Sequence, residues 1–151
     1  MKPVFEYLGP DDPKPMIQII RAVDLTADQV ARCKELSYGD EGYMSEDLDY
    51  ILDNERRWLY RYSKAILLSD PGKVWPIHGW ALVEPIYNRP RYAAQLFVDP
   101  SQRGKGYGTM LLSAAQRGIN NVPLCYVDEE NEGFFNKVPW LYEKFREKES
   151  V

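Results

Sequence analysis

The stretch from Ala94 to Leu112 constrains the fold of this chain more than any other part of the sequence. Residues 94–98 form a short, largely apolar run that ends in β-formers, and Pro100 cannot continue a central strand. Apolar residues then recur at helical spacing, at Met110, Leu111, Ala114 and Ala115. Gly118 is a natural helix stop. We therefore predict a strand, a tight turn and a helix.

Three glycines lie between this predicted strand and helix, at positions 104, 106 and 108. Glycine tolerates unusual backbone dihedrals and lets a ligand approach the backbone closely. The first turn of a helix presents unpaired N–H groups at the positive end of the helix dipole. Arg103 and Lys105 add positive charge. The stretch therefore predicts an anion site of the kind that binds phosphate groups.

Two common phosphate-binding patterns do not fit these residues. The P-loop pattern GxxxxGK[ST] is absent, and the glycine spacing is GxGxG instead of the GxGxxG of dinucleotide-binding folds. Too little chain follows Gly108 to build a nucleotide-binding half of the Rossmann type.

The hexapeptide Arg103–Gly108 resembles the acetyl-CoA-binding motif of the GNAT superfamily of N-acetyltransferases, Arg/Gln-x-x-Gly-x-Gly/Ala. It follows a strand that ends Val98-Asp99-Pro100 and precedes a helix that opens at Thr109, as in that family. The resemblance implies an α/β (α+β) fold, with a mixed, mostly antiparallel sheet flanked by helices. It also implies acetyl-CoA as co-substrate and no metal. A metal site is not expected from the residues either, since there is one histidine and the two cysteines are far apart.

The resemblance also implies which residues bind acetyl-CoA. Backbone groups at Leu96, Phe97 and Val98 would hold the pantetheine arm and polarise the thioester carbonyl. The pyrophosphate and the rest of the molecule would contact Arg103, Gly104, Lys105, Gly106, Tyr107, Gly108, Thr109 and Asn131.

Periodicity and turn signals predict the remaining elements without the motif. They are a strand over 16–21, a helix from the capping box at Thr26 to near Gly39, a second helix from Ser45, and strands at 65–68, 77–84, 91–98 and 122–127. In the second helix, we expect Leu48, Ile51 and Leu52 to be buried. Trp58, Tyr60 and Tyr62 are predicted to alternate along one face. This order of elements agrees with the GNAT fold.

The C-terminal part departs from the family pattern. One alignment takes Phe134–Trp140 as the family's Phe-Tyr-x-Lys-x-Gly-Phe stretch, and the other takes Leu141–Phe145, which makes Tyr142 the general acid. We favour a break at Pro139 and a final helix over 139–148, because proline inside a helix costs about 3 kcal/mol. Either alignment leaves too few residues for two closing strands. We expect a shortened C-terminal part, which another chain could complete as a homodimer.

Length and composition favour one domain over residues 16–151, preceded by a proline-rich arm over 1–15. The net charge of −4 makes general nucleic-acid binding unexpected. No apolar run approaches the roughly 18 residues of a membrane span, and no signal-peptide core is present. Cys33 and Cys125 lie in apolar settings, which favours buried free thiols and a cytoplasmic location.

Acetyl transfer to an amine requires a polarised carbonyl, a base for the amine proton and an acid for the thiolate. Glu84 is the first candidate for the base, because it ends an apolar strand next to the motif strand. His78 on the same strand is an alternative, and a solvated Glu84 and a structural His78 remain open. Gln95 could orient a water but cannot act as a base. Tyr142 is the candidate acid, with Tyr126 behind it.

Asp40 and Glu41 in the loop between the two predicted N-terminal helices, with Asp47 and Asp49 in the second helix, could attract a cationic amine, or could be a solvated loop and helix-start carboxylates. The sequence thus predicts an acetyl-CoA-dependent N-acetyltransferase that acts on a primary amine, in a protein or a small molecule, by direct transfer. The alternative is a catalytically weak or inactive GNAT-fold module that works by acyl-CoA binding or protein–protein interaction.

Overall fold

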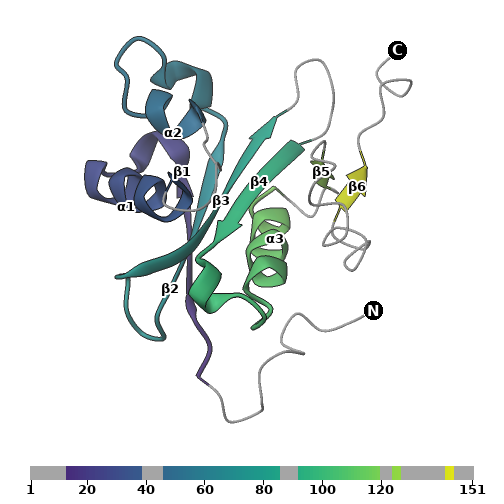
Figure 1. The fold of residues 1–151 in the computed structure, drawn as a ribbon. Coiled ribbons are helices and arrows are strands. Elements are labelled where there is room, and N and C mark those ends of the chain that lie inside the picture. Colours follow the sequence, from purple (N-terminus) through teal and green to yellow (C-terminus); the bar gives the residue numbers. More distant parts are fainter. Residues whose placement is uncertain (1–12, 39–45, 86–91, 120–123, 127–141, 145–151) are drawn as a thin grey trace.

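One sheet organises the described part of the chain, with its strands in the order β1-β2-β3-β4-β5-β6 (Figure 1). The computed structural model describes residues 13–38, 46–85, 92–119, 124–126 and 142–144. The strands are β1 Met16–Arg21, β2 Lys64–Ser69, β3 Ile77–Pro85, β4 Tyr92–Val98, β5 Leu124–Tyr126 and β6 Tyr142–Lys144. β1 to β4 pair antiparallel, whereas β5 is parallel to β4 and β6 is parallel to β5.

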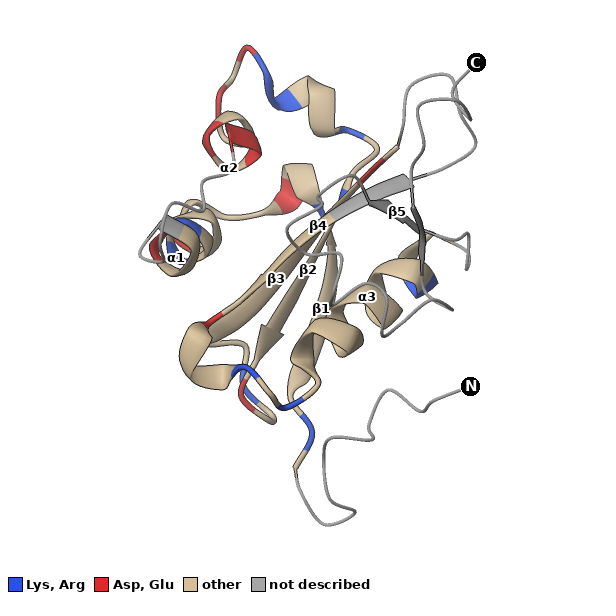
Figure 2. Ribbon diagram, turned by 45° about the vertical axis from the view of Figure 1, so that its right-hand side comes forward, with Lys and Arg blue, Asp and Glu red and all other residues tan. Residues whose placement is uncertain are grey.

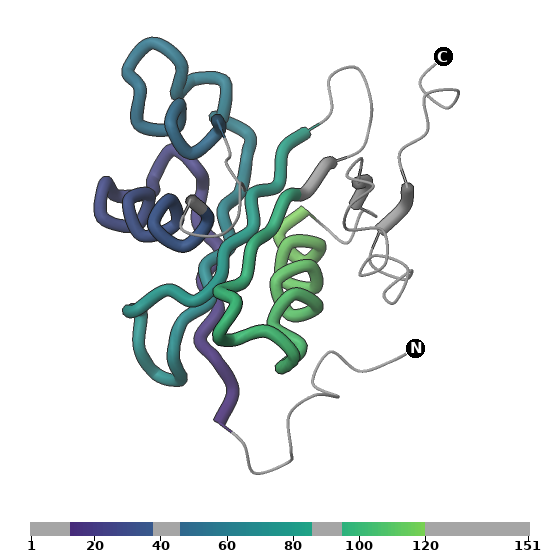
Figure 3. The backbone as a smooth tube through the Cα atoms, in the orientation of Figure 1, coloured from purple at the N-terminus to yellow at the C-terminus, as the bar shows by residue number. Residues whose placement is uncertain are grey.

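Helices cover both faces of this sheet (Figures 1 and 3). The α-helices are α1 Ala27–Tyr38, α2 Glu46–Tyr50 and α3 Tyr107–Gly118, and the 3-10 helices are η1 Ala22–Asp24, η2 Arg57–Tyr60 and η3 Pro100–Gln102. α1 and α2 lie on one face and α3 lies on the other. The expected order of strand, helix, helix, three antiparallel strands and helix is confirmed, and so is the GNAT-like fold class.

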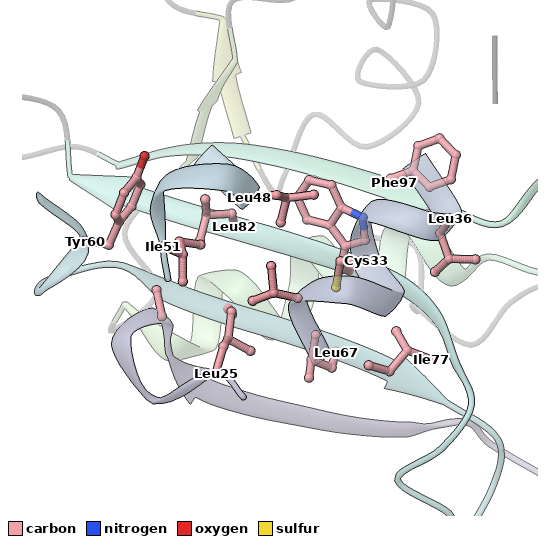
Figure 4. Close-up of a cluster of buried hydrophobic side chains, with 14 residues drawn as sticks. Leu25, Cys33, Leu36, Leu48, Ile51, Tyr60, Leu67, Ile77, Leu82 and Phe97 are labelled. Carbon is pink, nitrogen blue, oxygen red and sulfur yellow. The ribbon is translucent and has the colours of Figure 1, made fainter. Parts of the chain in front are cut away.

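Successive side chains of β3 alternate between two buried clusters, one on each face of the sheet. Ala81 and Val83 pack in the cluster that includes α3, whereas Trp80 and Leu82 pack in the cluster under α1 and α2 (Figure 4). Successive side chains of a strand point to opposite faces, so both faces of this strand are buried. By the same alternation, Glu84 lies on the face that α1 and α2 cover.

The predicted capping box at the start of α1 is present. The Gln29 amide donates to Thr26 Oγ1 at 3.1 Å, and the Thr26 amide donates to Gln29 Oε1 at 2.9 Å. The helix ends at Tyr38, as predicted. Cys33 is buried on its inner face as a free thiol, and burial raises the pKa of this thiol to about 12.

Two expectations for the segment after α2 are wrong. Leu48 and Ile51 are buried, but Leu52 is 40% exposed, because α2 ends at Tyr50 and the helical face does not continue. Tyr60 is buried while Trp58 and Tyr62 are exposed. The chain forms the 3-10 helix η2 here, and its three residues per turn do not keep alternate side chains on one face.

The predicted final helix over 139–148 is also wrong at the residues that the structure describes. Tyr142–Lys144 forms β6, and its residues pair with Leu124–Tyr126 of β5. Pairing along β5 satisfies backbone groups that a helix would have satisfied within itself. Asn131 and the Phe134–Trp140 stretch lie outside the described residues, as does most of the expected N-terminal arm.

Candidate active site

The glycine loop, which we define as residues 103–106, connects η3 to α3. The carboxylate of Asp99 accepts a hydrogen bond from the Ser101 amide at 3.1 Å and so caps η3. Gly104 and Gly106 have φ angles of 87° and 81°, in the left-handed region that favours glycine. Gly106 is the N-cap of α3, so its conformation sets the direction in which the helix begins.

The first turn of α3 points unpaired amides toward this loop. The first intrahelical bond runs from the Met110 amide to the Gly106 carbonyl at 3.0 Å, so the amides of residues 107–109 precede the helical ladder. Basic residues lie in the same segment (Figure 2). Amide donors, a helix dipole and positive charge together make a phosphate site chemically feasible here.

Arg103 and Lys105 of the glycine loop make different contacts. The Arg103 guanidinium turns back onto β4, where its Nε donates to the Val98 carbonyl at 2.9 Å and its plane lies 5.2 Å from the Phe97 ring centroid. Lys105 is exposed and donates to the side chain of Gln102. Thr109 is buried in the first turn of α3. Arg103 therefore braces the loop, while Lys105 is accessible to a ligand.

β4 has an edge that β5 covers only at its beginning. β5 pairs with β4 at Tyr92 and Ala93, and in the described residues this pairing does not reach Leu96 or Val98. On the β3 side, the Asp99 amide donates to the His78 carbonyl at 2.8 Å. Antiparallel bonding alternates, so Leu96 and Val98 direct their backbone groups toward the uncovered edge.

Four side chains from separate elements form what we call the carboxylate cluster: Asp47 of α2, Tyr60 of η2, Glu84 of β3 and Gln95 of β4. The Tyr60 hydroxyl donates to Asp47 Oδ1 at 2.6 Å, and Gln95 Nε2 donates to Asp47 Oδ2 at 2.5 Å. Asp47 also shares a hydrogen bond with Glu84. The side chains of Glu84 and Gln95 lie on the same face of the sheet, because Leu82, two residues before Glu84, is the cross-strand partner of Gln95.

The environment of Glu84 favours its protonated form. Burial is the main cause and the negative charge of Asp47 is the second, and together they raise the pKa of Glu84 to about 7. Glu84 Oε1 is buried and has no hydrogen-bond partner among the residues that the structure describes. Asp47 receives donors on both oxygens, so the negative charge of the pair is better stabilised on Asp47. A carboxyl group poised near neutrality can exchange a proton with a ligand.

Tyr60 of η2 is the fourth member of the carboxylate cluster. Burial and its hydrogen bond to Asp47 raise the pKa of the Tyr60 hydroxyl well above its usual range, so it remains a donor. Figure 4 shows its hydroxyl at the margin of the buried side chains under α1 and α2.

His78 does not join the carboxylate cluster. It lies six residues before Glu84 on β3, about 20 Å away along an extended strand. Its Nε2 is 2.7 Å from Asp70 Oδ1, and its Nδ1 is buried without a partner in the described part of the chain. His78 and Glu84 are therefore in separate places on β3, and the alternative that His78 acts as the base stays a prediction.

Tyr142 is placed by the register of the sheet. Tyr142 of β6 is the register partner of Leu124 of β5. Leu124 is also the partner of Tyr92 of β4, and Tyr92 is the partner of Pro85 of β3. Tyr142 is thus three strands away from Pro85, about 14 Å at the usual strand spacing.

Sequence reasoning missed the central position of Asp47. It is one of three acidic residues in the first turn of α2, where carboxylates are favoured by the helix dipole alone (Figure 2). Gln95 was expected only to orient a water. The one local signal was an amide side chain inside an otherwise apolar strand, which needs a polar partner when it is partly buried.

Within the residues that the structure describes, no three His, Cys, Asp or Glu side chains are arranged to hold a metal ion. None of the helices described is long and apolar enough to cross a membrane.

Comparison with known proteins agrees with this architecture. Residues 48–146, more than half of the chain, match the family model described as an acetyltransferase (GNAT) domain. No curated protein and no solved structure matched the chain significantly. The matched segment runs from within α2 through the glycine loop to β6. It includes three of the four residues of the carboxylate cluster, and Asp47 lies one residue before it. The chain belongs to the GNAT acetyltransferase family.

Proposed function

We propose that this protein is an acetyl-CoA-dependent N-acetyltransferase that transfers the acetyl group directly to a primary amine. The observation that carries the proposal is the partly buried Glu84, with a pKa of about 7, on the strand next to the uncovered edge of β4. Residues 16–151 would act as one domain in the cytoplasm.

Acetyl-CoA would be held at two places. The glycine loop and the first turn of α3 would bind the pyrophosphate through backbone amides, with Lys105 adding charge and Gly108 and Thr109 lying behind the loop. The pantetheine arm would lie along the uncovered edge of β4, where backbone groups of Leu96 and Val98 are directed and Phe97 lies between them. Asn131 and Tyr107 belong to the proposed contact set as well.

A backbone amide at this edge would polarise the thioester carbonyl as negative charge develops on its oxygen. Such a donor is fixed by the sheet and does not reorganise during the reaction. The amine nitrogen then attacks the carbonyl carbon, and the carbon–sulfur bond breaks.

Glu84 would take the proton that the amine must lose. An amine arrives largely as its ammonium form, and a carboxylate with a pKa near 7 is ionised at mildly basic pH and can accept that proton. Burial and the negative charge of Asp47 keep the pKa of Glu84 high, and Gln95 and Tyr60 hold Asp47 in place through their hydrogen bonds. Tyr142 would return a proton to the departing CoA thiolate from the other side of the opening between β4 and β5.

The test combines binding and turnover in one protein preparation. Calorimetric titration with acetyl-CoA should give micromolar binding at about one site per chain. A panel of amines is then incubated with the enzyme and acetyl-CoA, and acetylated products are detected by mass spectrometry. Binding with turnover that Glu84→Gln removes supports the proposal. Binding without any turnover would favour the acyl-CoA-binding module, and absence of both with a folded protein would overturn the proposal.

A further inference from the structure

A hollow of about 550 Å³ lies where β1 ends, β2 begins and α3 ends. Its lining includes Arg21, Arg61, Ser63, Lys64 and Gly118, and we call it the basic hollow. α3 has 12 residues, so its two ends are about 18 Å apart. The basic hollow is therefore separate from the glycine loop, which lies at the start of that helix.

Two of its cations are held side by side by the sheet. Arg21 of β1 is the cross-strand partner of Lys64 of β2, so both side chains lie on the same face. That face is the one that carries α3, because Ile66, two residues after Lys64, packs in the α3 cluster. Like charges directly opposite each other in a ladder repel.

Nearby acidic groups compensate this repulsion only weakly. Arg21 has one ion pair, with Asp24 at 3.9 Å, and both side chains are 58% exposed. Lys64 makes no side-chain hydrogen bond or ion pair in the part of the chain that the structure describes. An anion between these two side chains would replace the repulsion by two attractions.

The third cation is fixed in orientation. The Arg61 guanidinium lies 5.2 Å from the Trp58 ring centroid and 4.9 Å from the Tyr62 ring centroid, and it donates to the Trp58 carbonyl at 2.8 Å. An arginine has five N–H donors, so this single bond leaves donors for a ligand. Stacking reduces the side-chain entropy that binding would otherwise cost.

The negative end of the α3 dipole balances only part of the positive charge of Arg21, Arg61 and Lys64. Carbonyls at a helix C-terminus carry roughly half a negative charge, whereas three cationic side chains line the hollow. We propose that the basic hollow binds a small oxyanion, the phosphate or carboxylate group of a ligand, between Arg21, Arg61 and Lys64.

The test measures anion binding in a variant whose glycine loop is blocked, so that any binding observed takes place elsewhere. The Gly106→Glu protein, in which the loop is blocked, is titrated with inorganic phosphate and, separately, with succinate, against sodium chloride of equal ionic strength. Saturable changes in the ¹H–¹⁵N signals of Ser63 and Lys64, with one or both anions but not with chloride, are expected. Saturation by only one of the two probes identifies the oxyanion class. Absence of saturation with both probes would overturn the proposal.

Matched variants locate the site. Lys64→Gln should weaken anion binding at least tenfold, whereas Lys73→Gln removes the same charge from the turn at the opposite end of β2 and should leave it unchanged. Equal affinity in both variants would place the anion elsewhere and contradict the proposal.

Discussion

The glycine loop depends on its backbone, whereas the carboxylate cluster depends on its side chains. The loop depends on backbone conformation: two glycines with positive φ angles turn the chain so that the amides of α3 face outward. The cluster depends on side chains that four elements bring together, with a shared hydrogen-bonded carboxylate at its centre. The loop is contiguous in sequence and largely exposed, whereas the cluster spans residues 47–95 and is partly buried.

This difference has a consequence for substitution. In the loop, almost any side chain at a glycine is harmful, because the backbone conformation itself is the functional feature. In the cluster, the effect depends on charge and on the ability to donate, so conservative changes can separate chemistry from structure. The predictions below use that contrast.

Gly106→Glu should have the largest effect. The substitution forces a side chain into a φ of 81° and adds negative charge at the start of α3. Acetyl-CoA affinity measured by calorimetry should fall more than a hundredfold. Gly72→Glu is the matched control, because Gly72 has a φ of 69°, open space around it and no part in the loop. If both variants lose affinity equally, backbone strain alone explains the result.

Glu84→Gln should lower kcat/KM by about 10² to 10³, the usual contribution of a general base. Acetyl-CoA affinity should be unchanged, since Glu84 is not in the loop. In the parent enzyme, log kcat/KM should rise with pH through about 7, and this inflection should vanish in the variant. The exposed Glu55→Gln serves as a control for the charge change. An unaltered pH profile in Glu84→Gln would mean that another group accepts the proton.

Asp47→Asn should have a smaller and more specific effect. It removes the negative charge that helps to raise the pKa of Glu84, while the single amide oxygen of asparagine can still accept one of the two hydrogen bonds that Tyr60 and Gln95 donate to Asp47. The inflection in the pH–rate profile should move to lower pH, and kcat/KM at pH 8 should fall by no more than about tenfold. An inflection that stays near pH 7 would assign the shift to burial alone.

The smallest predicted effect concerns stability. The folded protein holds the Glu84 proton more tightly than the unfolded chain, whose pKa is about 4.5. The Glu84 contribution to stability is therefore largest below the unfolded-state pKa and is lost as pH rises to about 7. Glu84→Gln should remove this loss, so that its melting temperature exceeds that of the parent by a few degrees at pH 8. Circular dichroism melts between pH 5 and 8 would show parallel curves if Glu84 were solvated.

The sequence was sufficient to predict the four antiparallel strands, α1, α3 and the glycine loop, because their signals are local. Period-two runs, a capping box and glycines at a turn each report on neighbouring residues. The carboxylate cluster could not be predicted as a unit. Glu84 was recognised as a candidate, but its pairing with Asp47 depends on how α2 docks over β3 and β4, which no local pattern encodes.

The errors have the same origin. Leu52 and the Trp58–Tyr62 alternation were judged by spacing, yet α2 ends after five residues and a 3-10 turn follows. Residues 142–144 were predicted to be helical from the position of Pro139, yet β5 provides partners for their backbone groups. Where a segment's partner comes from elsewhere in the chain, local propensity is a weak guide.

The burial of Cys33 determines whether its thiol can accept an acetyl group from a thioester. A thiol whose pKa is about 12 contributes almost no thiolate at neutral pH, and its position under α1 keeps thioesters away from it. It cannot compete with the acceptor amine by thioester exchange. Assays that follow released CoA with a thiol-reactive dye should accordingly read no background from this residue as long as the protein stays folded.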